Sequence, residues 1–236
     1  MEGAAVAVTD IDKSSADKIT KEIQSLRGKS FSLRVDVTDK HDIDRMISTT
    51  IENFGKLDIF IANAGIVAIG PLIETEEKVW DRLMDVNAKG VFLSCPAAAR
   101  QMIDQGNGGR IIINASGAGK VAPGKNKPLG VYAATKHAVV GFGKQLGLEL
   151  SDHQILVNSI CGGIIDTPMW DFIDREVSRI QGLPEGSVKS EAVAGVPLGR
   201  IQKPEDIANV VAFLVSDDAN YITASALNAE GGILPC

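Results

Sequence analysis

The sequence is poor in the residues that build disulfide frameworks and metal sites. Its 236 residues include three cysteines, Cys95, Cys161 and Cys236, which lie far apart and form no Cys-x-x-Cys pair. The three histidines do not cluster with them. Because zinc sites need several Cys or His at short spacing, the sequence predicts neither a disulfide framework nor metal binding. This cysteine usage fits a reducing compartment, and we expect a cytoplasmic protein.

Long hydrophobic runs and blocks of basic residues are also missing. The longest apolar runs, such as residues 210–215, are far shorter than the roughly 20 residues that span a membrane. The first residues lack the basic-then-apolar pattern of a signal peptide. The formal net charge is −6, which argues against electrostatic binding of nucleic acid or of an anionic membrane. Small molecules and other proteins remain as partners.

Two kinds of apolar segment alternate along the chain. Short, nearly continuous runs are typical of strands buried on both faces, and apolar residues three or four positions apart are typical of helices. The predicted strands are residues 4–8, 31–35, 57–62, 110–115, 155–160 and 226–229, with helical patterns between them. This alternation predicts an α/β fold with a parallel sheet covered by helices on both faces. The length suits one domain over residues 1–236, with a helical excursion at about 168–197.

A tyrosine and a lysine one helical turn apart are the first candidates for chemistry. Tyr132 and Lys136 begin an Ala/Val-rich helical pattern that runs from residue 130 to 150. Side chains at i and i+4 share one face of a helix. A phenol titrates near pH ~10, and a neighbouring ammonium lowers its pKa, so Tyr132 is a candidate general acid/base. Alone, the pair is a weak signal, because this spacing arises readily in any helix.

Further motifs follow in a set order along the alternating strands and helices. They are Asn63-Ala64-Gly65, Asn87, Ser116, Tyr132-x-x-x-Lys136 and Thr167-Pro168. With these motifs in this order, the chain resembles the short-chain dehydrogenase/reductase family from about residue 3 to residue 232. The resemblance implies a single Rossmann-type, doubly wound parallel sheet.

The resemblance assigns four residues to the reaction. Tyr132 would exchange a proton with the substrate oxygen, and Lys136 would lower the phenol's pKa and hold the nicotinamide ribose. Ser116 would hydrogen-bond the substrate oxygen, and Asn87 would fix a water molecule in a proton relay. A hydride moving to or from carbon must be matched by a proton at oxygen, so these roles are chemically consistent. Without the resemblance, Ser116 is a turn serine and Asn87 a residue at a helix kink.

The resemblance also implies an NAD-binding surface. Asp10, at the end of the first strand, would accept hydrogen bonds from the adenosine ribose hydroxyls. Its carboxylate would repel the 2′-phosphate of NADP, so we expect NAD (NADH) as the cofactor. The other expected cofactor contacts are Ile11, Asp36, Val37, Asn63, Ala64, Gly65, Tyr132, Lys136, Ile165 and Thr167.

The substrate side is most similar to two groups within the family. Thr167-Pro168-Met169-Trp170 and the residues after it are similar to acetoin reductases (butanediol dehydrogenases) and to polyol dehydrogenases such as those for sorbitol. The similarity implies reversible, NAD-dependent oxidation of a secondary alcohol in a small diol, hydroxyketone or polyol. The expected substrate contacts are Ser116, Ala118, Tyr132 and Trp170. Trp170 is interpreted equally well as a packing residue.

The sequence departs from the family at its start. The family opens with a strand, a Thr-Gly-x-x-x-Gly-x-Gly turn and a helix, whereas residues 2–8 match the family's second strand. The unmatched first strand is central in a doubly wound sheet, so the strand at 4–8 should be separated from the strand at 57–62 or pair with it directly. Three explanations stay open: a sequence boundary that omits the start, a truncated enzyme that compensates through oligomer contacts, and a relative that has lost dinucleotide binding.

A second departure lies after the fifth predicted strand. Gly162 stands where the family usually has proline. Proline restricts the unfolded chain more than glycine does, so the glycine is expected to loosen the loop next to the nicotinamide.

The alternative function is a catalytically silent, oligomer-forming relative that no longer binds dinucleotide. Members of the family usually form tetramers or dimers through the helices that carry Asn87 and Tyr132. We therefore expect a homo-oligomer, with the apolar stretches 97–99 and 138–140 at the subunit contact. NADH binding separates this alternative from the enzyme.

Overall fold

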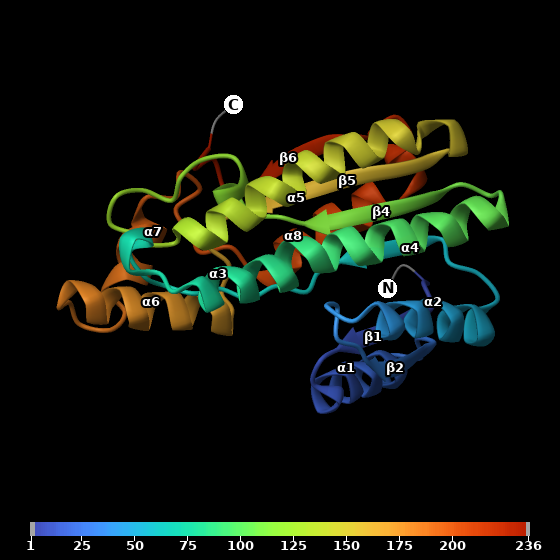
Figure 1. The fold of residues 1–236 in the computed structure, drawn as a ribbon, viewed down its shortest axis with the longest axis horizontal. Helices are drawn as coiled ribbons and strands as arrows, with labels where there is room; N and C mark the ends of the chain where they lie inside the picture. The colour runs from blue at the N-terminus through green and yellow to red at the C-terminus, as the bar shows by residue number, and fades with distance from the viewer. Residues whose placement is uncertain (1–2, 235–236) are drawn as a thin grey trace.

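The structure, a computed structural model, describes residues 3–234, and its strands alternate with helices (Figure 1). Neighbouring strands are paired in parallel in every ladder of the described residues. The prediction of an α/β fold with parallel strands and helices is confirmed. The strands are β1 (Val6–Asp10), β2 (Ser30–Arg34), β3 (Ile59–Ala62), β4 (Gly109–Asn114), β5 (Ile155–Gly162) and β6 (Ser225–Ala229).

The strands form two hydrogen-bonded sheets. β1 pairs with β2, and β3, β4, β5 and β6 pair in that order. No ladder joins β1 to β3 within the described residues, so of the two expected arrangements, separation or direct pairing, the structure has the first. β1 pairs only with β2 and β3 only with β4, so each has one edge outside any described ladder. Ile61 in β3 is 43% exposed and Val6 in β1 is 37% exposed, although strands of parallel sheets are normally buried.

Helices cover both faces of the four-stranded sheet. α4 (Gly90–Gln105) and α5 (Gly130–Glu149) run side by side over one face, and α8 (Pro204–Leu214) lies behind the other (Figure 1). In β4, Ile113 belongs to the cluster under α4 and α5, whereas Ile112 belongs to the cluster under α8. This alternation explains why the strand is apolar on both faces.

The first part of the chain packs against α4 and shares its core. α1 (Lys13–Ser25) and α2 (Lys40–Phe54) accompany the β1–β2 sheet, and Ile43 of α2 lies in the same buried cluster as the residues of α4. Val37 packs so closely on Gly90, the first residue of α4, that a Cβ at that glycine would lie 2.8 Å from Val37 Cγ2. Any larger residue at position 90 would push the two parts of the molecule apart.

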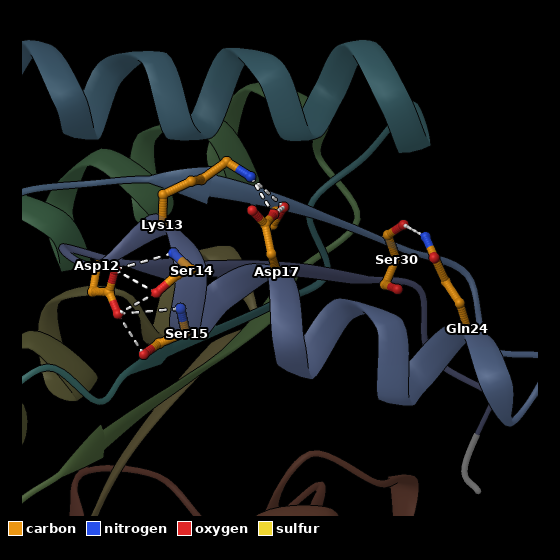
Figure 2. A network of polar contacts seen from close by, with 8 residues as sticks. Asp12, Lys13, Ser14, Ser15, Asp17, Gln24 and Ser30 are labelled. Atoms are coloured by element: carbon orange, nitrogen blue, oxygen red, sulfur yellow. Dashed lines mark hydrogen bonds and ion pairs between the residues drawn. The ribbon is translucent and has the colours of Figure 1, made fainter.

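One carboxylate holds the start of α1 (Figure 2). Asp12 accepts hydrogen bonds from the backbone N–H groups of Ser14 (3.1 Å) and Ser15 (3.3 Å) and from both hydroxyls. An N-cap of this kind satisfies N–H groups that have no partner inside the helix. The hydrogen bonds, first that of the Ser15 hydroxyl and then that of the Ser14 hydroxyl, lower the pKa of Asp12. The N-terminus of α1 is therefore occupied by a fixed anion.

The helical segment between β3 and β4 is interrupted. It consists of α3 (Glu77–Leu83), a π-helix η2 (Met84–Lys89) and α4. Asn87, which is 1% exposed, lies in the π-helix, where its side chain is held by the loop after β3. A single π turn inserted between α-helices is frequently found at functional sites.

The helical excursion after β5 contains two separate helices. α6 (Pro168–Gln181) and α7 (Ser187–Ala194) lie together at one end of the molecule and are called the α6–α7 cap below (Figure 1). The carboxylate of Asp174, which is 4% exposed, accepts hydrogen bonds from the backbone N–H groups of Gly186 (2.6 Å) and Lys189 (2.7 Å). A buried side chain of α6 thus caps the start of α7.

The apolar stretches expected at a subunit contact are buried inside this chain, so that prediction is wrong. Ala97, Ala98 and Ala99 are at most 8% exposed, and Val139 and Val140 pack in the same core cluster. Ala138 alone of residues 138–140 is exposed. α4 contacts α2 as well as β3 and β4, so more than one side of this helix is buried inside the chain. The exposed apolar residues of α4 and α5 include Phe92 (59%) and Leu148 (63%).

Short connections complete the described residues. They include the 3-10 turns η1 (Leu72–Glu74), η3 (Gly117–Gly119), η4 (Ser151–His153) and η5 (Asp217–Ala219). Cys95 and Cys161 are free and buried, and Cys236 lies outside the described residues. Over residues 3–234 no group of three or more metal-ligating side chains comes together, and no helix has the length and apolar character that crossing a membrane requires.

Candidate active site

α5 brings Tyr132 and Lys136 to one face, as their spacing predicts. The Lys136 ammonium nitrogen lies 5.6 Å from the centroid of the Tyr132 ring. It donates a hydrogen bond of 2.8 Å to the carbonyl of Asn114, the last residue of β4. Lys136 is 5% exposed, and burial lowers its pKa to about 8. The lysine is thus fixed by the sheet rather than solvated on the surface.

Burial raises the pKa of Tyr132, and the neighbouring side chain of Ser116 offsets this only in part. The lowered pKa predicted for Tyr132 is therefore wrong for this structure. The reason is that removing a phenolate from water costs more than its neighbours return, while the Lys136 ammonium donates to Asn114.

Ser116 reaches this phenol from the turn after β4. Its side chain accepts a hydrogen bond of 3.1 Å from the backbone N–H of Ala118 and so caps η3. Burial raises the pKa of the Cys161 thiol on the neighbouring strand β5, and the backbone of Ser116 is one of the groups that lower it. The serine is a turn residue, as the simpler interpretation has it, and it also contacts Tyr132.

Asn87 holds the loop after β3 against α5. Its side-chain oxygen accepts from the N–H of Ile66 (2.8 Å), and its amide nitrogen donates to the carbonyl of Ile66 (2.9 Å) and to Thr135 Oγ1 (3.0 Å). Both amide hydrogens and the oxygen are therefore engaged. The contacts support a structural role for the side chain, and the water relay expected of Asn87 remains a prediction.

The loop of Asn63, Ala64 and Gly65 runs directly beside the lysine. Asn63 accepts a hydrogen bond of 2.8 Å from the side chain of Asn114. A Cβ built on Gly65 would lie 3.7 Å from Lys136 Nζ and 3.5 Å from Asn87 Oδ1. The backbone at Gly65 is thus within van der Waals reach of the lysine, and four separate segments meet at one point.

The residues expected on the adenosine side lie at the ends of β1 and β2. Asp10 and Ile11 are exposed, and Asp10 accepts the N–H of Asp12 at 2.9 Å. Asp36 accepts both the N–H (2.9 Å) and the hydroxyl (2.7 Å) of Thr38, which lower its pKa, the hydroxyl contributing most. These residues stand on the two-stranded sheet, whereas the catalytic candidates belong to elements packed on the four-stranded sheet.

The segment after β5 carries the remaining candidates. Thr167 donates a hydrogen bond of 3.3 Å to the carbonyl of Ile165 and stands just before α6. Ile165 forms an isolated β-bridge with Gln202. Trp170 and Tyr132 both pack against one buried cluster, which consists of Leu129, Ile173, Val177 and Val188. This contact supports the interpretation of Trp170 as a packing residue next to the site.

The sequence motifs pointed to none of three residues that hold this site together. Asn114 binds both Lys136 and Asn63, and the thiol of Cys161 interacts with the backbone of Ser116. Gln202 binds the segment after β5. The position of Asn114 at a predicted strand end was a usable signal, because ligand sites of parallel sheets lie there.

The structure allows a test of whether a nicotinamide dinucleotide fits. Asp10 and Asp36 present carboxylates for ribose hydroxyls and adenine edges, and Lys136 has two N–H donors left after its bond to Asn114. The pyrophosphate finds no partner at α1, because the Asp12 carboxylate already accepts the N–H groups of that helix start. The two ends of the cofactor therefore fit the residues present, and its centre does not.

Cavity size does not locate the chemistry. One cavity of about 490 Å³ is lined by residues that include Arg200, Gln202 and Glu230, and one of about 500 Å³ by residues that include Ile69 and Arg179. Tyr132 and Ser116 line neither of them. The hydrogen-bonded cluster of side chains, rather than a closed cavity, defines the candidate site.

Comparison with known proteins shows which proteins the chain is similar to. A family model described as enoyl-(acyl carrier protein) reductase matches residues 1–234. Sorbitol dehydrogenase of Cereibacter sphaeroides is 36% identical over 98% of this chain and 88% of its own length. Diacetyl reductase [(S)-acetoin forming] of Staphylococcus epidermidis is 34% identical over 99% of this chain and 90% of its own length. A crystal structure of an actinorhodin polyketide ketoreductase variant with NADPH superposes with a TM-score of 0.93, at 31% identity, over 98% of this chain and 88% of that one.

Proposed function

The chain belongs to the short-chain dehydrogenase/reductase family, and we propose that within it the protein is an NAD-dependent enzyme that interconverts a secondary alcohol and the ketone. Enzymes of this family are oxidoreductases that use a nicotinamide dinucleotide. The observation that carries the proposal is the position of the Lys136 ammonium 5.6 Å from the phenol ring of Tyr132, with Ser116 near enough to that phenol to lower its pKa.

The two hydroxyls are placed to hold one substrate oxygen. Ser116 and Tyr132 can each donate a hydrogen bond to an oxygen between them, and these bonds strengthen as negative charge develops on it. Tyr132 then gives its proton to the forming alcohol or takes one from it. When bound, the nicotinamide dinucleotide supplies or accepts the hydride at the carbon.

Lys136 serves both the phenol and the cofactor in this proposal. Its bond to the Asn114 carbonyl orients the ammonium, and its remaining donors would hold the ribose hydroxyls. A cation here stabilises the phenolate that forms when Tyr132 gives up its proton. Ile165 and Thr167 would contact the nicotinamide, and the loop at Gly65 would line the cofactor.

The carboxylates after β1 support NAD over NADP. Asp10 is exposed at the strand end, and the ionised Asp12 follows two residues later. The nearby ammonium of Lys13 is already bound to Asp17 and to Ser32. A 2′-phosphate at this place would meet the negative charges of Asp10 and Asp12, which disfavours NADP.

Replacing Asp10 tests this preference. The Asp10→Ala variant should lose roughly tenfold or more of the discrimination between NADH and NADPH, because one like-charge repulsion is removed. The ratio of kcat/KM for the two cofactors measures it. Asp58→Ala is the control. Asp58 is exposed just before β3, at the N-terminal end of that strand, whereas Asp10 stands at the C-terminal end of β1. An unchanged ratio in Asp10→Ala would assign the preference elsewhere.

The proposed substrate class is supported by the named relatives and by the residues of the α6–α7 cap beside Tyr132. The relatives named above act on sorbitol or form acetoin. Ala118 borders Ser116, and Trp170 packs beside Tyr132, so a small polar diol, hydroxyketone or polyol is the substrate we propose. A panel of such compounds, assayed by NADH absorbance, tests the class.

The test of the proposed function uses both tyrosines of the sequence. Tyr132→Phe should lower turnover by roughly 10²- to 10⁴-fold, the usual contribution of a general acid/base, and leave NADH affinity nearly unchanged. Tyr221→Phe is the matched control, because Tyr221 is fully exposed. Turnover in Tyr132→Phe that equals the wild type would remove the tyrosine from its role. Failure of the wild type to bind NADH would favour the silent, oligomer-forming relative.

We also propose that residues 1–236 form one domain that assembles as a homo-oligomer. The two sheets share a buried core, which supports one domain. Phe92 and Leu148 are exposed on the adjacent helices α4 and α5, and this supports a subunit contact there.

A further inference from the structure

The segment between β5 and α6 is expected to be loose, because Gly162 stands at its start. The structure shows why proline is not tolerated there without adjustment. A Cβ built on Gly162 would lie 3.1 Å from Ile165 Cδ1 and 3.3 Å from Ile207 Cδ1, closer than side chains normally pack. The restraint that proline would provide must therefore come from another residue.

That restraint comes from Gln202, which stands just before α8. Its backbone N–H donates to the carbonyl of Ile164 (3.0 Å), and its carbonyl accepts from the N–H of Asp166 (2.8 Å). These two bonds flank the bridge to Ile165 and hold the middle of the segment in an extended conformation.

The side chain of Gln202 holds the beginning of the same segment. Its amide oxygen accepts from the N–H of Gly163 (3.0 Å), and its amide nitrogen donates to the carbonyl of Ala229 (2.6 Å) at the end of β6. One side chain thus joins the exit of β5 to the exit of β6, using both ends of its amide.

The joint is closely packed as well as hydrogen-bonded. A Cβ built on Gly163 would lie 2.9 Å from the Cβ of Glu230, which is 7% exposed. The backbone of Gly163 therefore lies flat against the residue after β6. A small shift of the Gln202 amide would move Gly163 and, with it, Ile165.

We propose that Gln202 is a positioning residue that sets Ile165 and Thr167 against the nicotinamide by fixing both ends of residues 163–166. The inference rests on the proposed function, since these two residues are its nicotinamide contacts. In this inference the position of the nicotinamide depends on the side chain of Gln202, which contacts neither the cofactor nor the substrate.

The test compares two glutamines that make the same kind of clamp. Gln105 binds the N–H and the carbonyl of Leu57, both at 2.9 Å, at the opposite end of the sheet. Gln202→Met removes the two side-chain bonds described above. Gln105→Met removes both bonds to Leu57 and a third that Gln105 accepts from Gln101 (3.2 Å), and both variants keep the length of the side chain. Both should lower the thermal midpoint. Only Gln202→Met should speed hydrogen exchange at the amides of Gly163 and Asp166.

Binding of two ligands gives the second measurement. NADH carries the nicotinamide, and ADP-ribose has the same adenosine and pyrophosphate without it. Gln202→Met should weaken NADH binding about tenfold, as the loss of two hydrogen bonds implies, and leave ADP-ribose binding unchanged. In Gln105→Met neither affinity should change.

The outcomes separate the two proposals. Unchanged exchange at Gly163, or an equal effect of Gln202→Met on NADH and ADP-ribose, would overturn the role of Gln202 and leave the proposed function standing. A wild-type chain that binds ADP-ribose but not NADH would overturn the nicotinamide site and this inference with it.

Discussion

At the scale of single residues, Lys136 shows how burial changes a charge. The ammonium is held by one carbonyl and lies among the elements of the candidate site, so removal from water dominates and its pKa falls from 10.5 to about 8. The sequence suggested a lysine acting on Tyr132. The structure shows a lysine whose own protonation is the more sensitive quantity near neutral pH.

The lowered pKa of Lys136 should make the free energy of unfolding depend on pH. Below about pH 8 Lys136 is protonated in both the folded and the unfolded state. Between about pH 8 and 10.5 the unfolded chain keeps the proton that the folded chain has lost, so the free energy of unfolding from this group rises with pH. Buried thiols act in the opposite direction from about pH 9, because burial raises the pKa of Cys95 to about 12.

Comparison with Lys136→Met isolates the effect of the lysine. Cys95, whose pKa depends on its burial and on Ser94, contributes equally to both proteins, so the wild type should gain stability relative to the variant as pH rises from 8 to 10. Urea unfolding at several pH values measures the difference. A difference that stays constant over this range would contradict the lowered pKa of Lys136.

At the scale of elements, the α6–α7 cap depends on one buried carboxylate. Gly182, Pro184 and Gly186 mark the break between the two helices in the sequence. The contact that orders α7 is not local, since Asp174 lies twelve and fifteen positions before the two N–H groups it accepts. Propensity and spacing rules reach about one helical turn and do not find such a contact.

Removal of that carboxylate should destabilise the cap. Asp174→Ala should lower the free energy of unfolding by about 2–5 kcal/mol, because two hydrogen bonds to a charged group are lost in a buried place. Urea unfolding and hydrogen exchange in α7 measure it. The control is Asp171→Ala, which removes an exposed ion pair with Lys189 and should cost less than about 1 kcal/mol. Equal effects of the two variants would argue against the cap.

At the scale of the whole molecule, the parallel strands form two separate hydrogen-bonded sheets, whereas one buried hydrophobic cluster contains residues from both parts of the chain. The β1–β2 unit carries the adenosine-side candidates and packs through α2 and Val37 onto α4, while β3 ends beside Lys136. The two groups of cofactor candidates are thus connected by helix packing rather than by strand pairing. The open edges of β1 and β3 leave Val6 and Ile61 partly in water.

The exposed Phe92 on α4 leads to a prediction about the oligomeric state. Phe92 is 59% exposed and contacts Phe142 of α5 at 6.2 Å between ring centroids. Phe92→Glu should shift the protein to a smaller assembly, because a charge is placed in an apolar contact. Light scattering after size-exclusion chromatography measures the mass. Ile19→Glu on α1 is the control, and an unchanged mass in Phe92→Glu would place the contact elsewhere.

The sequence by itself determined the alternation of strands and helices, the family and the meeting of Tyr132 with Lys136. Each of these depends on local periodicity or on an ordered set of motifs, which a one-dimensional pattern carries. Strand order narrowed the relation of β1 to β3 to separation or direct pairing, and the structure has the separation.

Only the tertiary structure decided the pKa of the phenol, the burial of residues 97–99 and the contacts of Asn114, Asp174 and Gln202. Burial, desolvation and hydrogen bonds between distant segments depend on which surfaces face each other after folding. Sequence spacing does not contain that information, and for this reason the residue types of the site were predicted while the forces acting on them were not.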